Sequence, residues 1–186
     1  MGGGKSHGSK SEFVTDVNVE READAFAAGL LMPSPLLRPI VNQGELSLNR
    51  IREIKDTFRT SFVSTAIRSV QHSDFPCEVV GLRNASIAWR FRPWKDPDPL
   101  TEGKCFRAPR GPILSQTAKR QWQAFENGIC EEQSFPSLLR AWFQTPPGPA
   151  EKEVTVWEHY LPVPIMDTLV VLLTVSEEEL FDLDLD

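Results

Sequence analysis

The apolar positions of residues 20–33 recur at the spacing of one helix face. Taking Phe26 as its centre, the stripe contains Ala23, Ala27 and Leu30 at spacings of three and four, which is typical of a helix that packs onto a core. Pro33 should end this helix near Met32, because proline disfavours helical geometry in the residue before it.

Glu22 lies four residues before Phe26, at the edge of this apolar stripe. A carboxylate there can turn partly inward, and a buried carboxylate must be paired, hydrogen-bonded or bound to a cation. The alternative is an ordinary amphipathic helix whose acidic first turn is solvated, which also suits the helix dipole.

The helical period returns after Ser47, which can cap a helix. The apolar positions of that helix are Leu48, Ile51, Ile54 and Phe58. Thr60 or Ser61 can open a second helix, and its apolar face consists of Phe62, Ala66 and Val70, flanked by Ile67.

This helical pair has two interpretations. It resembles a helix-turn-helix, in which Arg59 and Arg68 would face a phosphate backbone, or it is a helical hairpin that completes a small core. Residues 45–71 contain five Lys and Arg against three acids, a local charge of +2. A DNA-reading surface usually carries more positive charge, so the hairpin is favoured.

The period changes to that of β-strands after His72. Four runs rich in β-branched, aliphatic or aromatic residues predict strands, at Cys77–Leu82, Ser86–Phe91, Val154–Tyr160 and Leu169–Val175. We expect the first two to form a hairpin and the last two to be antiparallel neighbours joined by a turn around 162–167. Gln116–Asn127 predicts a helix ended by Gly128, and Ser137–Phe143 a weaker one.

Segregated helices and strands predict an α+β fold, with a helical N-terminal half and an antiparallel sheet in the C-terminal half. The net charge of −6 is distributed unevenly along the chain, because residues 151–186 contain ten Asp and Glu but one Lys. The three cysteines are widely spaced and read as free thiols of a reducing compartment. With no apolar run long enough to span a bilayer, we expect a cytoplasmic chain.

Glu22–Pro33 reads Glu-Ala-Asp-Ala-Phe-Ala-Ala-Gly-Leu-Leu-Met-Pro, and this signature segment resembles the ImmA/IrrE family of zinc metallopeptidases. In that family a helix carrying His-Glu-x-x-His supplies two zinc ligands and the general base, and a later helix supplies a glutamate as third ligand. The resemblance implies that Glu22 is this metal ligand, with Glu20 as the alternative.

The sequence departs from the family in its histidines, because His7, His72 and His159 do not stand in a His-Glu-x-x-His. The resemblance therefore predicts an N-terminally truncated member with no catalytic residue of its own, which does not hold zinc by itself. Its organisation would be a flexible lead (1–12), the end of a metallopeptidase-like helical domain (13–72), an α+β portion (73–176) and an acidic tail (177–186).

Two functions remain open at this stage. The first is a truncated peptidase of the family, whose members act in regulatory proteolysis of repressor-like proteins, inactive as this chain. The second is a non-catalytic regulatory module that binds a protein, or DNA, through the helical pair. No membrane partner is expected, and the sequence contains no phosphate-binding loop or nucleophile elbow.

Overall fold

The computed structural model describes residues 26–93, 113, 115–142 and 155–175. After a helical stretch at residues 26–31, the elements follow in a simple order. They are α2 (Ser34–Val41), α3 (Leu48–Phe58), α4 (Phe62–His72), β1 (Cys77–Arg83), β2 (Ser86–Phe91), α5 (Gln116–Glu126), β3 (Gln133–Leu138), η1 (Leu139–Ala141), β4 (Thr155–Val163), η2 (Pro164–Met166) and β5 (Thr168–Thr174). The predicted α+β class is confirmed.

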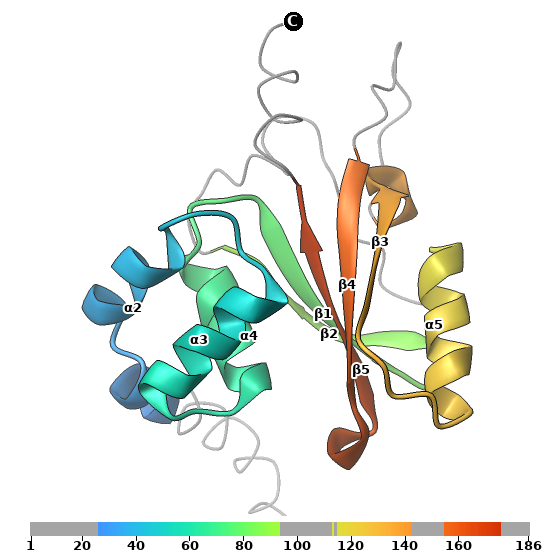
Figure 1. Cartoon of the computed structure of the whole chain (residues 1–186), viewed down its shortest axis with the longest axis horizontal. Coiled ribbons are helices and arrows are strands. Elements are labelled where there is room, and N and C mark those ends of the chain that lie inside the picture. Colours follow the sequence, from blue (N-terminus) through green and yellow to red (C-terminus); the bar gives the residue numbers. More distant parts are fainter. Residues whose placement is uncertain (1–25, 94–112, 114, 143–154, 176–186) are drawn as a thin grey trace, which may run out of the picture.

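The five strands form one antiparallel sheet in the order β2-β1-β5-β4-β3. The last strand in sequence, β5, lies at the centre between β1 and β4. Figure 1 shows α2, α3 and α4 on one side of the sheet and α5 on the other. Because β5 is covered on both faces, all seven of its residues are buried, which explains its continuous apolar sequence.

Each face of the sheet has its own core. On the side of α2–α4, helix residues such as Leu37, Ile51 and Val70 pack with Val79 and Leu172 of the sheet. On the opposite side, the buried residues of α5 pack over Val80, Leu82, Val156, Tyr160 and the odd-numbered residues of β5. The first core joins the N-terminal helices and the sheet into one packed unit.

The predicted helix starts are confirmed at atomic detail. Ser47 accepts a hydrogen bond from the backbone N–H of Arg50, and Ser61, rather than Thr60, does the same for Ser64. Arg59 ends α3 in a left-handed conformation with φ 53°. Each cap satisfies a backbone group that a helix end leaves without an internal partner.

One predicted helix is wrong. Ser137 and Leu138 end the edge strand β3, and Leu139–Ala141 is a short 3₁₀ turn. The register of β3 on β4, with Phe135 opposite Glu158, supplies ladder hydrogen bonds that override a weak helical pattern. Its Pro136 is tolerated because β3 lies at the edge of the sheet.

Among the helices of the described residues, none has the length and apolar character needed to cross a membrane.

Candidate functional site

The end of the signature segment is the first candidate site. Glu22 and Glu20 lie outside the described residues, as does His7. Residues 26–31 are helical and the helix ends before Met32, as predicted. The predicted packing of its stripe is wrong, because Phe26 is 69% exposed and Leu30 is 65% exposed.

The signature segment is attached to the body of the protein through Met32, which is fully buried. Its carbonyl oxygen accepts a hydrogen bond from Arg68 Nη2 at 3.1 Å, and its sulfur accepts one from the Thr60 hydroxyl at 3.7 Å. The side chains of residues 26–31 therefore project past the core, while the residue that follows them anchors the segment to α4.

Arg68 does not face solvent, in contrast to the helix-turn-helix interpretation. It is 8% exposed and it spans from α4 to Met32 and to Ser34 Oγ at 3.4 Å. Burial lowers the pKa of its guanidinium. Every residue of α4 is buried or half-buried because this helix lies between the other helices and β1, so it offers no free face to a DNA groove.

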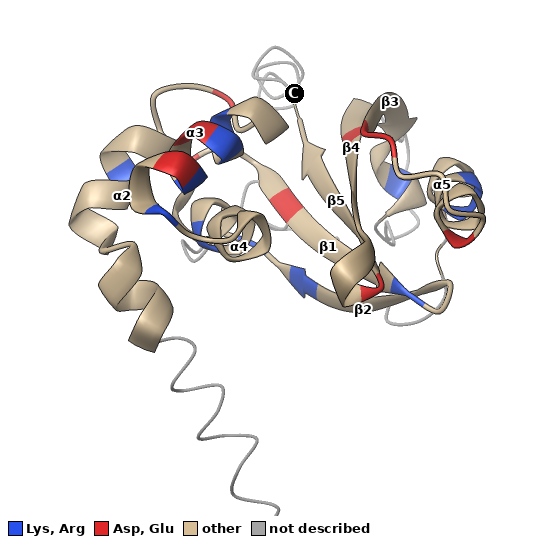
Figure 2. Cartoon of the chain, turned by 60° about the horizontal axis from the view of Figure 1, so that its bottom comes forward, with Lys and Arg blue, Asp and Glu red and all other residues tan. Residues whose placement is uncertain are grey.

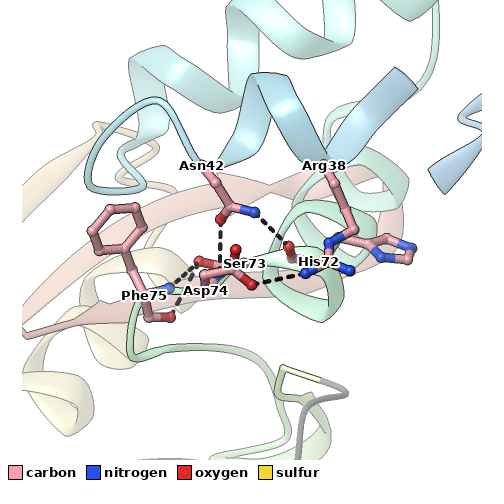
Figure 3. Close-up of polar contacts among 6 residues, drawn as sticks. All are labelled: Arg38, Asn42, His72, Ser73, Asp74 and Phe75. Atoms are coloured by element: carbon pink, nitrogen blue, oxygen red, sulfur yellow. Dashed lines mark hydrogen bonds and ion pairs between the residues drawn. The ribbon is translucent and has the colours of Figure 1, made fainter. Parts of the chain in front are cut away.

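A group of polar contacts, which we call the polar junction, connects α2 to the end of α4 (Figure 3). Asn42 donates from Nδ2 to the His72 carbonyl oxygen at 3.2 Å, and its Oδ1 accepts from the Asp74 backbone N–H at 2.7 Å. Arg38 Nη2 lies 3.1 Å from Asp74 Oδ1. The amide side chain of Asn42 thus ties together backbone groups where α4 ends.

His72 lies at the polar junction, and its side chain is 8% exposed. Its Nε2 lies 3.2 Å from the hydroxyl oxygen of Ser34. Burial lowers the pKa of His72, and the positive charges of Arg68 and Arg38 lower it further. The imidazole is therefore neutral at pH 7.

A second polar centre lies on the α5 face of the sheet, around the fully buried carboxylate of Glu158. It accepts hydrogen bonds from the Ser115 hydroxyl at 2.8 Å, the Trp142 indole N–H at 2.5 Å and the Tyr160 hydroxyl at 2.6 Å. Burial and the charge of Glu158 raise the pKa of Tyr160 far above its usual range, so the phenol stays protonated and donates.

This centre around Glu158 was not predicted from the sequence, although the sequence contains one signal for it. Val156, Glu158 and Tyr160 alternate along β4 and share its buried face. His159 points to the opposite face, as expected for adjacent residues of a strand, where its ring stacks on Trp157. The other partners of Glu158, Ser115 and Trp142, are distant in the sequence and could not be assigned without the fold.

Glu78 is a second buried carboxylate in the same cross-strand row. Glu78 and Glu158 each lie opposite Leu173, on either side of β5. Glu78 forms ion pairs with Arg90 and Arg92, whereas no ion pair joins Glu158 to any Lys or Arg of the described residues. The two carboxylates are stabilised by different means, the first by cations and the second by neutral donors.

The described residues do not fit a zinc site. They contain no group of three or more His, Cys, Asp or Glu side chains that could hold a metal ion. A comparison with protein-family models and a comparison with curated proteins each found no match.

Proposed function

We propose that this chain is a member of the ImmA/IrrE family of zinc metallo-endopeptidases, which act in regulatory proteolysis of repressor-like proteins, and that it is not a peptidase by itself. The signature segment supports the family, and Glu22 is its candidate third ligand. The observation that carries the proposal is the exposed apolar surface of residues 26–36.

This apolar surface consists of Phe26, Leu30 and Leu31 of the first helical stretch and Leu36 of α2, all more than half exposed. Residues 26–37 contain no charged side chain. In Figure 2 the ribbon that leads into α2 carries no blue or red, whereas the ribbon of α3 carries both colours. Several exposed apolar side chains in one segment without charges are typical of an interaction site.

Phe26 and Leu30 are one helical turn apart, so the surface has the spacing that receives a second helix. In the family that the signature segment resembles, a helix with His-Glu-x-x-His and the helix that carries the glutamate supply ligands to the same zinc ion. Such a helix would complete a three-ligand set with Glu22, and the printed sequence does not contain it. Zinc catalysis requires three protein ligands and an open position for water.

Zinc content tests the proposal. We expect the 186-residue chain to hold no stoichiometric zinc, because one carboxylate gives a fraction of the affinity of a full ligand set. If the genomic sequence before Met1 encodes an in-frame His-Glu-x-x-His, the extended chain should bind one zinc and cleave its substrate. Glu22→Gln should impair both in the extended chain, because an amide lacks the charge that the cation needs.

Glu20→Gln is the matched control and should leave zinc binding almost unchanged. The outcome that contradicts the proposal is one tightly held zinc per 186-residue chain. If Glu22→Gln leaves the zinc content of the extended chain unchanged, Glu22 is not the zinc ligand.

The second candidate is a non-catalytic module that binds a protein partner through the same apolar surface. The burial of α4 and of Arg68 favours a protein over DNA. We expect the double variant Phe26→Ser, Leu30→Ser to leave the free energy of unfolding of the 186-residue chain within about 0.5 kcal/mol, because both side chains are exposed.

If a helix covers this surface in the extended chain, the same double variant should lower the free energy of unfolding there. The decrease should be several-fold larger than in the 186-residue chain. Denaturant unfolding of the four proteins measures the difference. Equal changes in both backgrounds would show that the added segment does not pack here, and would favour the non-catalytic module.

A further inference from the structure

Beside the polar junction, the hydroxyl of Ser34 lies against two nitrogen-bearing side chains, those of His72 and Arg68. Ser34, the first residue of α2, lies 3.2 Å from His72 Nε2 and 3.4 Å from Arg68 Nη2. Arg38, one turn further along α2, also acts on His72 through its charge. In Figure 3 its side chain reaches from α2 to the end of α4, beside the His72 ring. Ser34 therefore contacts Arg68 and His72 at the same time.

The neutral state of His72 suits these contacts. The Ser34 oxygen accepts from Arg68, so its hydroxyl hydrogen is available to donate to an unprotonated Nε2. A protonated imidazole donates from Nε2 instead, and the Ser34 oxygen then faces two cationic donors. The charges that act on His72 are those of Arg68 from α4 and Arg38 from α2, and Asp74, from the segment before β1, forms an ion pair with Arg38.

We propose that His72 is a proton-controlled latch, which holds the start of α2 and the end of the signature segment on α4 when it is neutral, and releases them when it is protonated. Arg68 connects the two parts of the latch, because the same Nη2 donates to Met32 and to Ser34. Release would free the segment that presents the apolar surface. The inference concerns the attachment of this segment and needs no zinc, so its failure leaves the zinc test untouched.

The direction of the pH effect follows from linkage. The folded pKa of His72 lies below its ordinary value of 6.5, so the released state binds the proton more tightly than the latched state. The stability that neutral His72 contributes to the latched state is fully present above pH 6.5. This contribution is lost as the pH falls from 6.5 toward the lower folded pKa. Within that window the ratio of latched to released molecules decreases by up to about tenfold per pH unit.

Amide hydrogen exchange of three residues tests the latch. The backbone N–H groups of Met32, Leu36 and Leu37 donate to Ala28 and Pro33 carbonyl oxygens within the latched segment. We expect their protection factors, corrected for intrinsic exchange, to fall between pH 7.5 and 5.5 while those of the central strand β5 stay constant. In His72→Gln, which does not titrate, protection of the three amides should be independent of pH in this range.

Arg38→Gln is a second variant that removes a partly exposed charge and therefore leaves the core intact. It should raise the pKa of His72, measured from its ring proton NMR signals, and reduce the pH-dependent loss of protection. His159→Gln is the control, because this histidine lies on the sheet and bonds to Ser134 and Thr174. The latch is disproved if His72→Gln or Arg38→Gln keeps the full pH response of the unchanged protein, or if His72 titrates at or above 6.5.

Discussion

Replacing Glu158 by Ala should destabilise the protein by about 3 kcal/mol or more, which lowers Tm by roughly 10 °C in a chain of this length. The substitution removes the shared acceptor of Ser115, Trp142 and Tyr160. Each buried donor left without an acceptor costs about 1–3 kcal/mol. Relief from burying a charge offsets part of this sum, because the three donors are neutral.

Thermal and denaturant unfolding measure this effect, and two variants frame it. Glu158→Gln keeps one acceptor oxygen in place and should cost less, about 1 kcal/mol. Glu126→Gln on the exposed side of α5 should have almost no effect. A Glu158→Ala protein as stable as the unchanged one would mean that the carboxylate does not organise this core.

Replacing Gly81 by Ala should cost about 2–3 kcal/mol, the range for forcing extra volume into a packed site. A Cβ at Gly81 would lie 2.1 Å from the Trp89 ring, far inside van der Waals contact. The two residues are directly opposite each other on β1 and β2, next to the irregularity between Gly81 and Leu82. The Trp89 ring covers the strand where a side chain would otherwise stand.

Gly29 provides the matched control, because a Cβ there meets no atom within 4 Å. Gly29→Ala should stabilise by up to about 1 kcal/mol, since Gly29 lies in a helix and Ala is the better helix former. A double-mutant cycle completes the test: Gly81→Ala should be tolerated better when Trp89 is also replaced by Val. If Gly81→Ala costs the same in both backgrounds, steric contact with Trp89 is not the cause.

Local sequence patterns predicted much of the fold, because the interactions behind them join residues that are close in the sequence. The caps at Ser47 and Ser61 depend on residues three positions away. The β1–β2 hairpin has its turn between its two strands, at Asn84 and Ala85, both with positive φ. The helix predicted at residues 137–143 failed because β3 exists only through its pairing with β4, which follows it across more than a dozen residues.

The candidate sites were less predictable, because their partners come from distant parts of the chain. The resemblance drew attention to Glu22, which lies outside the described residues, while residues 26–36 supplied the exposed apolar surface on which the proposed function depends. Arg68 is buried because residues far from it in the sequence, among them Met32, 36 positions earlier, lie against it. No helical period distinguishes that position from a solvent-facing arginine.

The hydrophobic period, the caps and the prolines determined by themselves where most of the helices and strands form, with β3 as an exception, and that the fold is α+β, since each acts through neighbouring residues. Tertiary structure alone decided that β5 is central, that Glu158 is buried among three donors, and that Phe26 and Leu30 remain exposed. Burial is a property of the surroundings, and at Glu158 those surroundings include Ser115, 43 residues away in the sequence. The free energy of a side chain therefore depends on contacts that its own segment does not encode.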